Sequence, residues 1–94
     1  MNEQAYAWAW KQADLSMEQS IVLLALAHFL DEGRIVGRMP MTELVRKSRQ
    51  TQAEVLVRLQ ELKAKALISY DLNLIPDTLV YSLPVEFDEV TTGE

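Results

Sequence analysis

The chain has 94 residues, of which 49% are hydrophobic, and this suits one domain with one modest core. It contains no cysteine and one histidine, which excludes disulfide bonds and leaves a zinc site short of ligands, so we expect no metal and no cofactor. The formal net charge is −5, which taken alone argues against a nucleic-acid partner.

Residues 5–11 alternate alanine with aromatic side chains. If this segment is extended, Tyr6, Trp8 and Trp10 share one face, and a period of two predicts a strand. Alanine is a poor strand former, so a helix is the alternative. We expect the two tryptophans to pack in the core or in a dimer, because large aromatic side chains mostly bury area. The other interpretation is an exposed aromatic patch for a partner.

A long helix is predicted to begin after Ser16, which forms a capping box with Gln19. The helix should run to about residues 31–32, with Gly33 as the residue that ends it. Residues 21–30 are apolar almost all round, so the helix should lie inside, with the other elements packed on it. The apolar run at 21–27 is too short to span a bilayer, which needs about 20 residues. With no secretory signal visible, we expect a cytoplasmic protein without a membrane partner.

Residues 34–38 are predicted to form a short strand, and Pro40 suits the entry to a helix. That helix should end at a polar break, residues 48–50. The next helix has a strong start signal, because Thr51 and Glu54 form a second capping box. Its buried face recurs at helical spacing. The expected core residues are Leu24, Leu44, Val45, Val55, Leu59, Leu62 and Ala66.

Two strands are predicted after Lys65, at residues 67–74 and 79–83, with turn residues between them. The turn carries Asp77 and no base, so this hairpin is not expected to enter a DNA groove. Pro84 should end the second strand, and residues 85–94 form an acidic flexible tail. The prediction is an α+β fold, mostly α, with three main helices and a C-terminal hairpin over residues 1–84.

The pattern E-L-V-x-K-S…T-x-x-E-V-x-x-x-L-x-E-L-x-x-x-x-L-I over residues 43–68 resembles winged helix-turn-helix domains. It looks most like those at the front of phage and plasmid replication proteins and in small prophage regulators. The opening at residues 7–12, WAWKQ-like, and the long helix at 21–34 are similar to theirs, so the resemblance covers residues 5–83. Two departures stand at Ser48–Arg49 and Ala66, where that family usually has glycine. The resemblance implies sequence-specific binding of double-stranded DNA, in replication initiation or transcription regulation.

The distribution of charge favours such a partner more than the total does. Residues 34–65 hold eight Lys or Arg against three Glu, a net of +5, whereas residues 1–33 carry −4 and residues 66–94 carry −6. Because salt screens charges beyond about 8–10 Å, local potential matters more than total charge. The alternative is that these charges are only solvated helix faces.

In a DNA complex the helix that begins after Thr51 would enter the major groove. Gln50, Gln52 and Ala53 could reach base edges, and Thr51 belongs to the same contact set. Phosphates would be held by Arg46, Lys47, Arg49 and Arg58. Arg49 lies in the turn, so it could contact base edges instead.

A second hypothesis follows from the opposite face of the same helix, where the side chains are small and weakly apolar: Ala53, Val57, Gln60 and Ala64. A flat face of this kind suits another protein helix. The alternative function is therefore an interaction module that forms a homodimer, or docks on a replication or regulatory protein, without binding DNA. Its interface would use Trp8, Trp10, Val57, Gln60 and Ala64. No catalytic constellation is visible, so we do not expect an enzyme.

Overall fold

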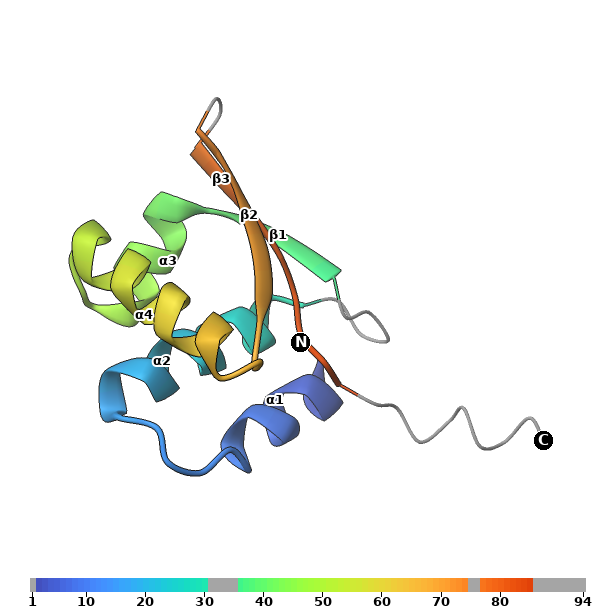
Figure 1. The fold of residues 1–94 in the computed structure, drawn as a ribbon. Helices are drawn as coiled ribbons and strands as arrows, with labels where there is room; N and C mark the ends of the chain where they lie inside the picture. The colour runs from blue at the N-terminus through green and yellow to red at the C-terminus, as the bar shows by residue number, and fades with distance from the viewer. Residues whose placement is uncertain (1, 31–35, 75–76, 86–94) are drawn as a thin grey trace.

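The computed structural model describes residues 2–30, 36–74 and 77–85, and in this part of the chain helices gather on one side of a small sheet (Figure 1). The predicted α+β class is confirmed, with one helix in addition to the three expected. The elements are α1 (Glu3–Trp10), α2 (Met17–Phe29), β1 (Val36–Pro40), α3 (Met41–Ser48), α4 (Gln52–Ala64), β2 (Ser69–Leu74) and β3 (Asp77–Ser82).

The N-terminal segment is helical, so the strand interpretation is wrong and the alternative, a helix, is confirmed. Asn2 caps α1, because its side-chain oxygen accepts a hydrogen bond from the Ala5 N–H at 3.0 Å. Alanine has the highest helix propensity, and Ala5 and Ala9 are buried where α1 packs on α2. The tryptophans separate: Trp8 packs partly buried against the core, whereas Trp10 is 64% exposed. The prediction that both tryptophans pack in the core of the chain is therefore wrong for Trp10.

Helix α2 is the element on which α1, α3, α4 and β1 all pack, as predicted. The capping box at its start is confirmed: the Ser16 hydroxyl accepts from the Gln19 N–H at 3.1 Å, and the Gln19 side chain accepts from the Ser16 N–H at 3.0 Å. The helix ends at Phe29, with Leu30 extended, so it is about two residues shorter than predicted. The expected stop at Gly33 lies outside the described residues.

The predicted break between α3 and α4 is confirmed at Arg49, which adopts the left-handed conformation with φ 61° and ψ 32°. Its N–H bonds to the Val45 carbonyl at 3.1 Å and closes the last turn of α3. The capping box that opens α4 is also confirmed, because the Thr51 hydroxyl accepts from the Glu54 N–H at 3.1 Å and Glu54 accepts from the Thr51 N–H at 2.8 Å.

Four of the seven predicted core residues are fully buried in one cluster, Leu44, Val55, Leu59 and Leu62, and Val45 packs partly buried against it. The prediction is wrong for Leu24, which is half-buried on the outer side of α2. It is also wrong for Ala66, which is exposed, because α4 ends at Ala64 and the helical phase does not continue past it.

Helix α4 ends in a Schellman motif centred on Ala66. The Ala66 N–H bonds to the Lys63 carbonyl at 2.9 Å and the Leu67 N–H to the Leu62 carbonyl at 3.0 Å. Ala66 has φ 62°, which favours glycine. Both departures from the winged-helix pattern, at the α3–α4 turn and at Ala66, thus include a residue with positive φ.

The sheet is antiparallel, and its order β1-β3-β2 places the last strand in the centre. The predicted hairpin is confirmed, although β2 begins at Ser69 and β3 at Asp77; the turn at 75–76 lies outside the described residues. Gly37 in β1 allows close packing, since a Cβ there would lie 2.7 Å from Leu30 and 2.9 Å from the Tyr81 ring. The Tyr81 hydroxyl donates to the Leu26 carbonyl at 2.6 Å and joins the sheet to α2.

The core continues one residue beyond the predicted domain end, because Val85 is buried with it; the remainder of the predicted tail, residues 86–94, is not described. Within the described segments no helix has the length and apolarity needed to cross a membrane.

Candidate nucleic-acid interface

Three basic side chains and the first turn of α4 are exposed to solvent around the α3–α4 turn. Arg46, Lys47 and Arg49 are exposed at the end of α3 and in the turn, and Gln52 and Ala53 are exposed at the start of α4. Arg49, in the left-handed conformation, follows the end of α3, and α4 begins three residues later at Gln52, so the last turn of α3 and the first turn of α4 are neighbours. Most of the predicted DNA contact set is therefore together and accessible to a partner.

The Arg46 guanidinium is already paired with a carboxylate. It donates to both oxygens of Glu43, at 2.7 and 2.8 Å, one helical turn earlier. The side chains of Arg46 and Glu43 are 71% and 35% exposed, and surface pairs of this kind contribute only about 0–1 kcal/mol. Exchanging Glu43 for a phosphate would therefore cost Arg46 little.

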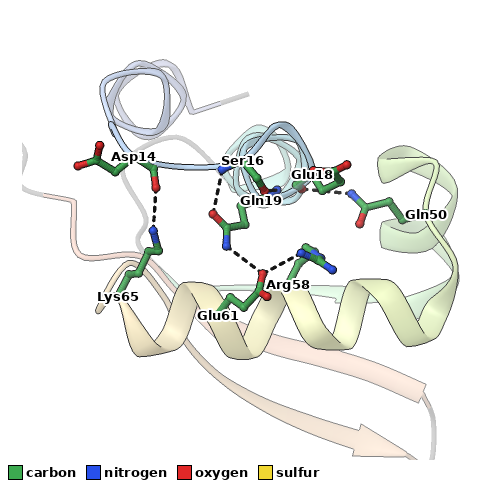
Figure 2. A network of polar contacts seen from close by, with 8 residues as sticks. All are labelled: Asp14, Ser16, Glu18, Gln19, Gln50, Arg58, Glu61 and Lys65. Carbon is green, nitrogen blue, oxygen red and sulfur yellow. Dashed lines mark hydrogen bonds and ion pairs between the residues drawn. The ribbon is translucent and has the colours of Figure 1, made fainter.

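Two other predicted DNA contacts, Gln50 and Arg58, instead make hydrogen bonds within the protein (Figure 2). The partner of Gln50 is on α2, and the partner of Arg58 is on α4 itself. The Gln50 amide donates to the Glu18 carbonyl at 3.1 Å, and the Arg58 guanidinium donates to Glu61 at 2.9 Å. The Gln50 side-chain oxygen and the Arg58 Nε are buried and make no hydrogen bond in the described part of the chain. Arg58 is 25% exposed at its side chain, so it lies mainly between helices.

These contacts belong to a polar network that fastens α4 along the start of α2 (Figure 2). Glu61 also accepts from the Gln19 amide at 2.8 Å, and at the far end the Lys65 ammonium donates to the Asp14 carbonyl at 2.7 Å. An ordinary intramolecular hydrogen bond contributes about 0.5–1.5 kcal/mol. The network thus fixes the position of α4 against α2 and covers most of the Arg58 side chain, whereas Lys65 stays exposed.

The N-terminal end of α4 carries a carboxylate. Hydrogen bonds from Thr51, first from its backbone N–H and then from its hydroxyl, together with the nearby Arg58, hold the pKa of Glu54 below its ordinary value. An ionised carboxylate stabilises a helix N-terminus. The Glu54 carboxylate also engages the Thr51 hydroxyl in a hydrogen bond. It places a negative charge at the N-terminal end of α4, the end that is expected to meet DNA.

The outward row of side chains on α4 carries no charge. Ala53, Val57, Gln60 and Ala64 are all exposed, and Val57 is 43% exposed. The two tryptophans of the predicted protein interface lie on a different helix, α1, and both helices pack on α2. The hairpin adds no positive charge, because residues 69–82 contain neither Lys nor Arg.

A groove on the outer side of α2 was not predicted. It has a volume of about 280 Å³ and is lined by Tyr6, Ile21, Leu24, Ala25, His28, Phe29 and Lys47. Ring contacts cross it from α1 to α3: Tyr6 and His28 have ring centroids 6.0 Å apart, His28 and Phe29 5.9 Å, and the Lys47 ammonium lies 5.7 Å from the Phe29 centroid. The sequence signal for it is the helical spacing of Ile21, Leu24 and His28.

Among the described residues no three acidic or histidine side chains are grouped to hold a metal ion. Comparison with family models, with curated proteins and with solved structures found no match.

Proposed function

We propose that the protein is a winged helix-turn-helix domain that binds double-stranded DNA sequence-specifically, as a cytoplasmic, non-catalytic factor in phage or plasmid replication initiation or transcription regulation. The observation that carries the proposal is the exposure of Arg46, Lys47 and Arg49 directly beside the uncovered first turn of α4. Three cations next to the positive end of a helix dipole attract the phosphate backbone.

In this proposal Arg46, Lys47 and Arg49 hold phosphates, and Gln52 and Ala53 read base edges in the major groove. Gln suits adenine through N6 and N7, and Ala can touch a thymine methyl group. Gln50 and Arg58 act by positioning, because their side chains are used in contacts within the protein. The acidic hairpin would stay outside the grooves.

Duplex binding at two salt concentrations tests the proposal. Affinity should fall steeply with salt, because each neutralised phosphate releases counterions. Replacing Arg46 and Arg49 together by alanine should weaken binding to all sequences alike and flatten the salt slope by up to about 2. Replacing Lys11 and Lys63, which are exposed and outside the α2–α4 network, by alanine makes the same change in net charge away from the α3–α4 turn, and should alter the slope less.

Base reading is tested separately with Gln52→Ala. If its contact is bidentate, preference at one base position should relax by about 1–3 kcal/mol, measured by competition with single-base variants of a selected site. Equal affinity for all duplexes in the wild-type protein, or no duplex binding at low salt, would contradict the proposal.

The uncharged outward row of α4 favours a second candidate, docking of a protein partner on that row. Val57 is 43% exposed there, in a row whose other members, Ala53, Gln60 and Ala64, carry no charge. Val57→Glu would place an unpaired charge in such an interface and should abolish the complex. If α4 faces DNA instead, the same variant should weaken duplex binding and leave the mass of the free protein in solution unchanged.

A further inference from the structure

One side of α2 has no cover within the chain. Helices apolar all round are normally enclosed, yet on this helix Met17 is 76% exposed and Phe29 37% exposed. Between them Ile21, Leu24 and Ala25 are only half-buried and form the floor of the 280 Å³ groove. The uncovered side is a continuous apolar strip along the helix, rather than scattered single residues, and strips of this kind mark contact with another molecule.

The spacing along this strip suits a partner helix. Met17, Ile21, Leu24 and His28 follow one another at intervals of four, three and four residues, which is the spacing of the apolar seam between two packed helices. The strip also has a projecting neighbour, since Trp10 of α1 is 64% exposed and its ring lies edge-on to Tyr6 at the groove wall, with centroids 6.3 Å apart.

Opposite charges stand at the two ends of the strip. Glu18 is exposed at the N-terminal end of α2, and Lys47 lies over Phe29 at the C-terminal end. Glu18, Ala25 and Phe29 are seven and four residues apart, so they lie on one row of the helix surface, about 16 Å from end to end. Both charges are therefore on the same side of the strip.

This arrangement is complementary to itself. If two copies face each other with their α2 helices antiparallel, a two-fold axis across the middle of the strip brings Glu18 of each copy to Lys47 of the other. The same operation covers the exposed apolar strip of both copies, with Trp10 beside it. A parallel pairing would leave like charges at the same end of the interface, on opposite sides of the seam, and would form no Glu18–Lys47 pair.

We propose that the α1–α2 face is a homodimer interface, in which a second copy of this chain covers the groove with its α2 antiparallel and forms two symmetric Glu18–Lys47 ion pairs. The face is distinct from the outward side of α4, but it shares Lys47 with the proposed phosphate contacts, so in the dimer that ammonium is paired with Glu18 and not with DNA. The dimer does not depend on DNA binding, and it is measured without DNA.

The test is the mass of the purified protein in solution as a function of concentration, by sedimentation equilibrium up to roughly 1 mM, the weak end of specific association. The wild-type protein should be in monomer–dimer equilibrium. Glu18→Lys and Lys47→Glu each replace two attractive pairs by two repulsive ones, and each should raise the dimer dissociation constant about tenfold or more. The double variant restores opposite charges and should return the constant to within about threefold of the wild-type value.

Asp71→Lys is the matched control, because it makes the same charge change as Glu18→Lys on exposed strand β2 and should leave the dissociation constant unchanged. Trp10→Gln tests the apolar part, and should weaken the dimer without loss of helical circular dichroism, since Trp10 is exposed in the single chain. A wild-type protein that stays monomeric would overturn the proposal and leave the face to a different protein. Single variants without effect, or a double variant that fails to restore the dimer, would also overturn it.

Discussion

Replacing Ala66 by glycine should stabilise the protein, although it removes a methyl group. Ala66 holds φ 62° in the Schellman motif that ends α4, and an L-residue there costs about 1–2 kcal/mol. The side chain is exposed, so little packing is lost. Glycine also raises the conformational entropy of the unfolded chain, which offsets about 0.4–1 kcal/mol of that stabilisation. The net expectation is a gain of about 0.5–1 kcal/mol in the free energy of unfolding.

Thermal and urea unfolding measure this gain, which should appear as a rise of roughly 2–8 °C in Tm for a domain of this size. Ala64→Gly is the matched control, because Ala64 is also exposed but is the last residue of α4. Glycine in a helix should lower the free energy of unfolding by about 0.5–1 kcal/mol. If both variants lose stability to the same extent, the left-handed assignment at Ala66 is refuted.

Three further predictions concern the same domain. Leu59→Ala should lower the free energy of unfolding by about 2–5 kcal/mol in urea titrations, because Leu59 is fully buried; a loss well below 1 kcal/mol would contradict the core assignment. Glu61→Ala should cost about 1–3 kcal/mol, since it leaves Gln19 and Arg58 without their acceptor, whereas Glu43→Ala removes an exposed pair worth at most about 1 kcal/mol. The lowered pKa of Glu54 favours its ionised form in the folded state, so the stability advantage of the wild type over Glu54→Gln should be full above pH 4.5 and vanish as the pH falls below it; an advantage that persists in acid would contradict this.

Local signals predicted the helix starts well, because each depends on a few adjacent residues. Ser16 with Gln19 and Thr51 with Glu54 cap helices where the sequence indicates. The start of α1 was missed because its cap, Asn2, lies outside the alternating segment that suggested a strand. The alternation of alanine and aromatic residues allowed either a strand or a helix. The packing of Ala5 and Ala9, four residues apart, on α2 favours the helix.

The candidate site was predictable in composition but not in orientation. A sequence shows that Gln50 and Arg58 are polar residues of the helix-turn-helix, but not that the Gln50 amide donates to the Glu18 carbonyl of α2, or that Glu61, the partner of Arg58 within α4, also accepts from Gln19 of α2. The contacts with α2 join elements distant in the chain, so their competition with DNA appears only in three dimensions. The α2 groove was missed for a related reason: its apolar residues looked like core residues until the tertiary arrangement left them uncovered.

The central position of β3 has a consequence for synthesis. Strands β1 and β2 both pair with β3 and not with each other, so neither strand can complete its hydrogen bonds until residue 82 has been made. At the usual 5–20 residues per second, the 42 residues from 41 to 82 take roughly 2–8 s. During that interval β1 leaves the ribosome with its backbone donors and acceptors unsatisfied by a neighbouring strand. Arg38 and Pro40 in that strand, one charged and one lacking an N–H, reduce the risk that two nascent chains pair there.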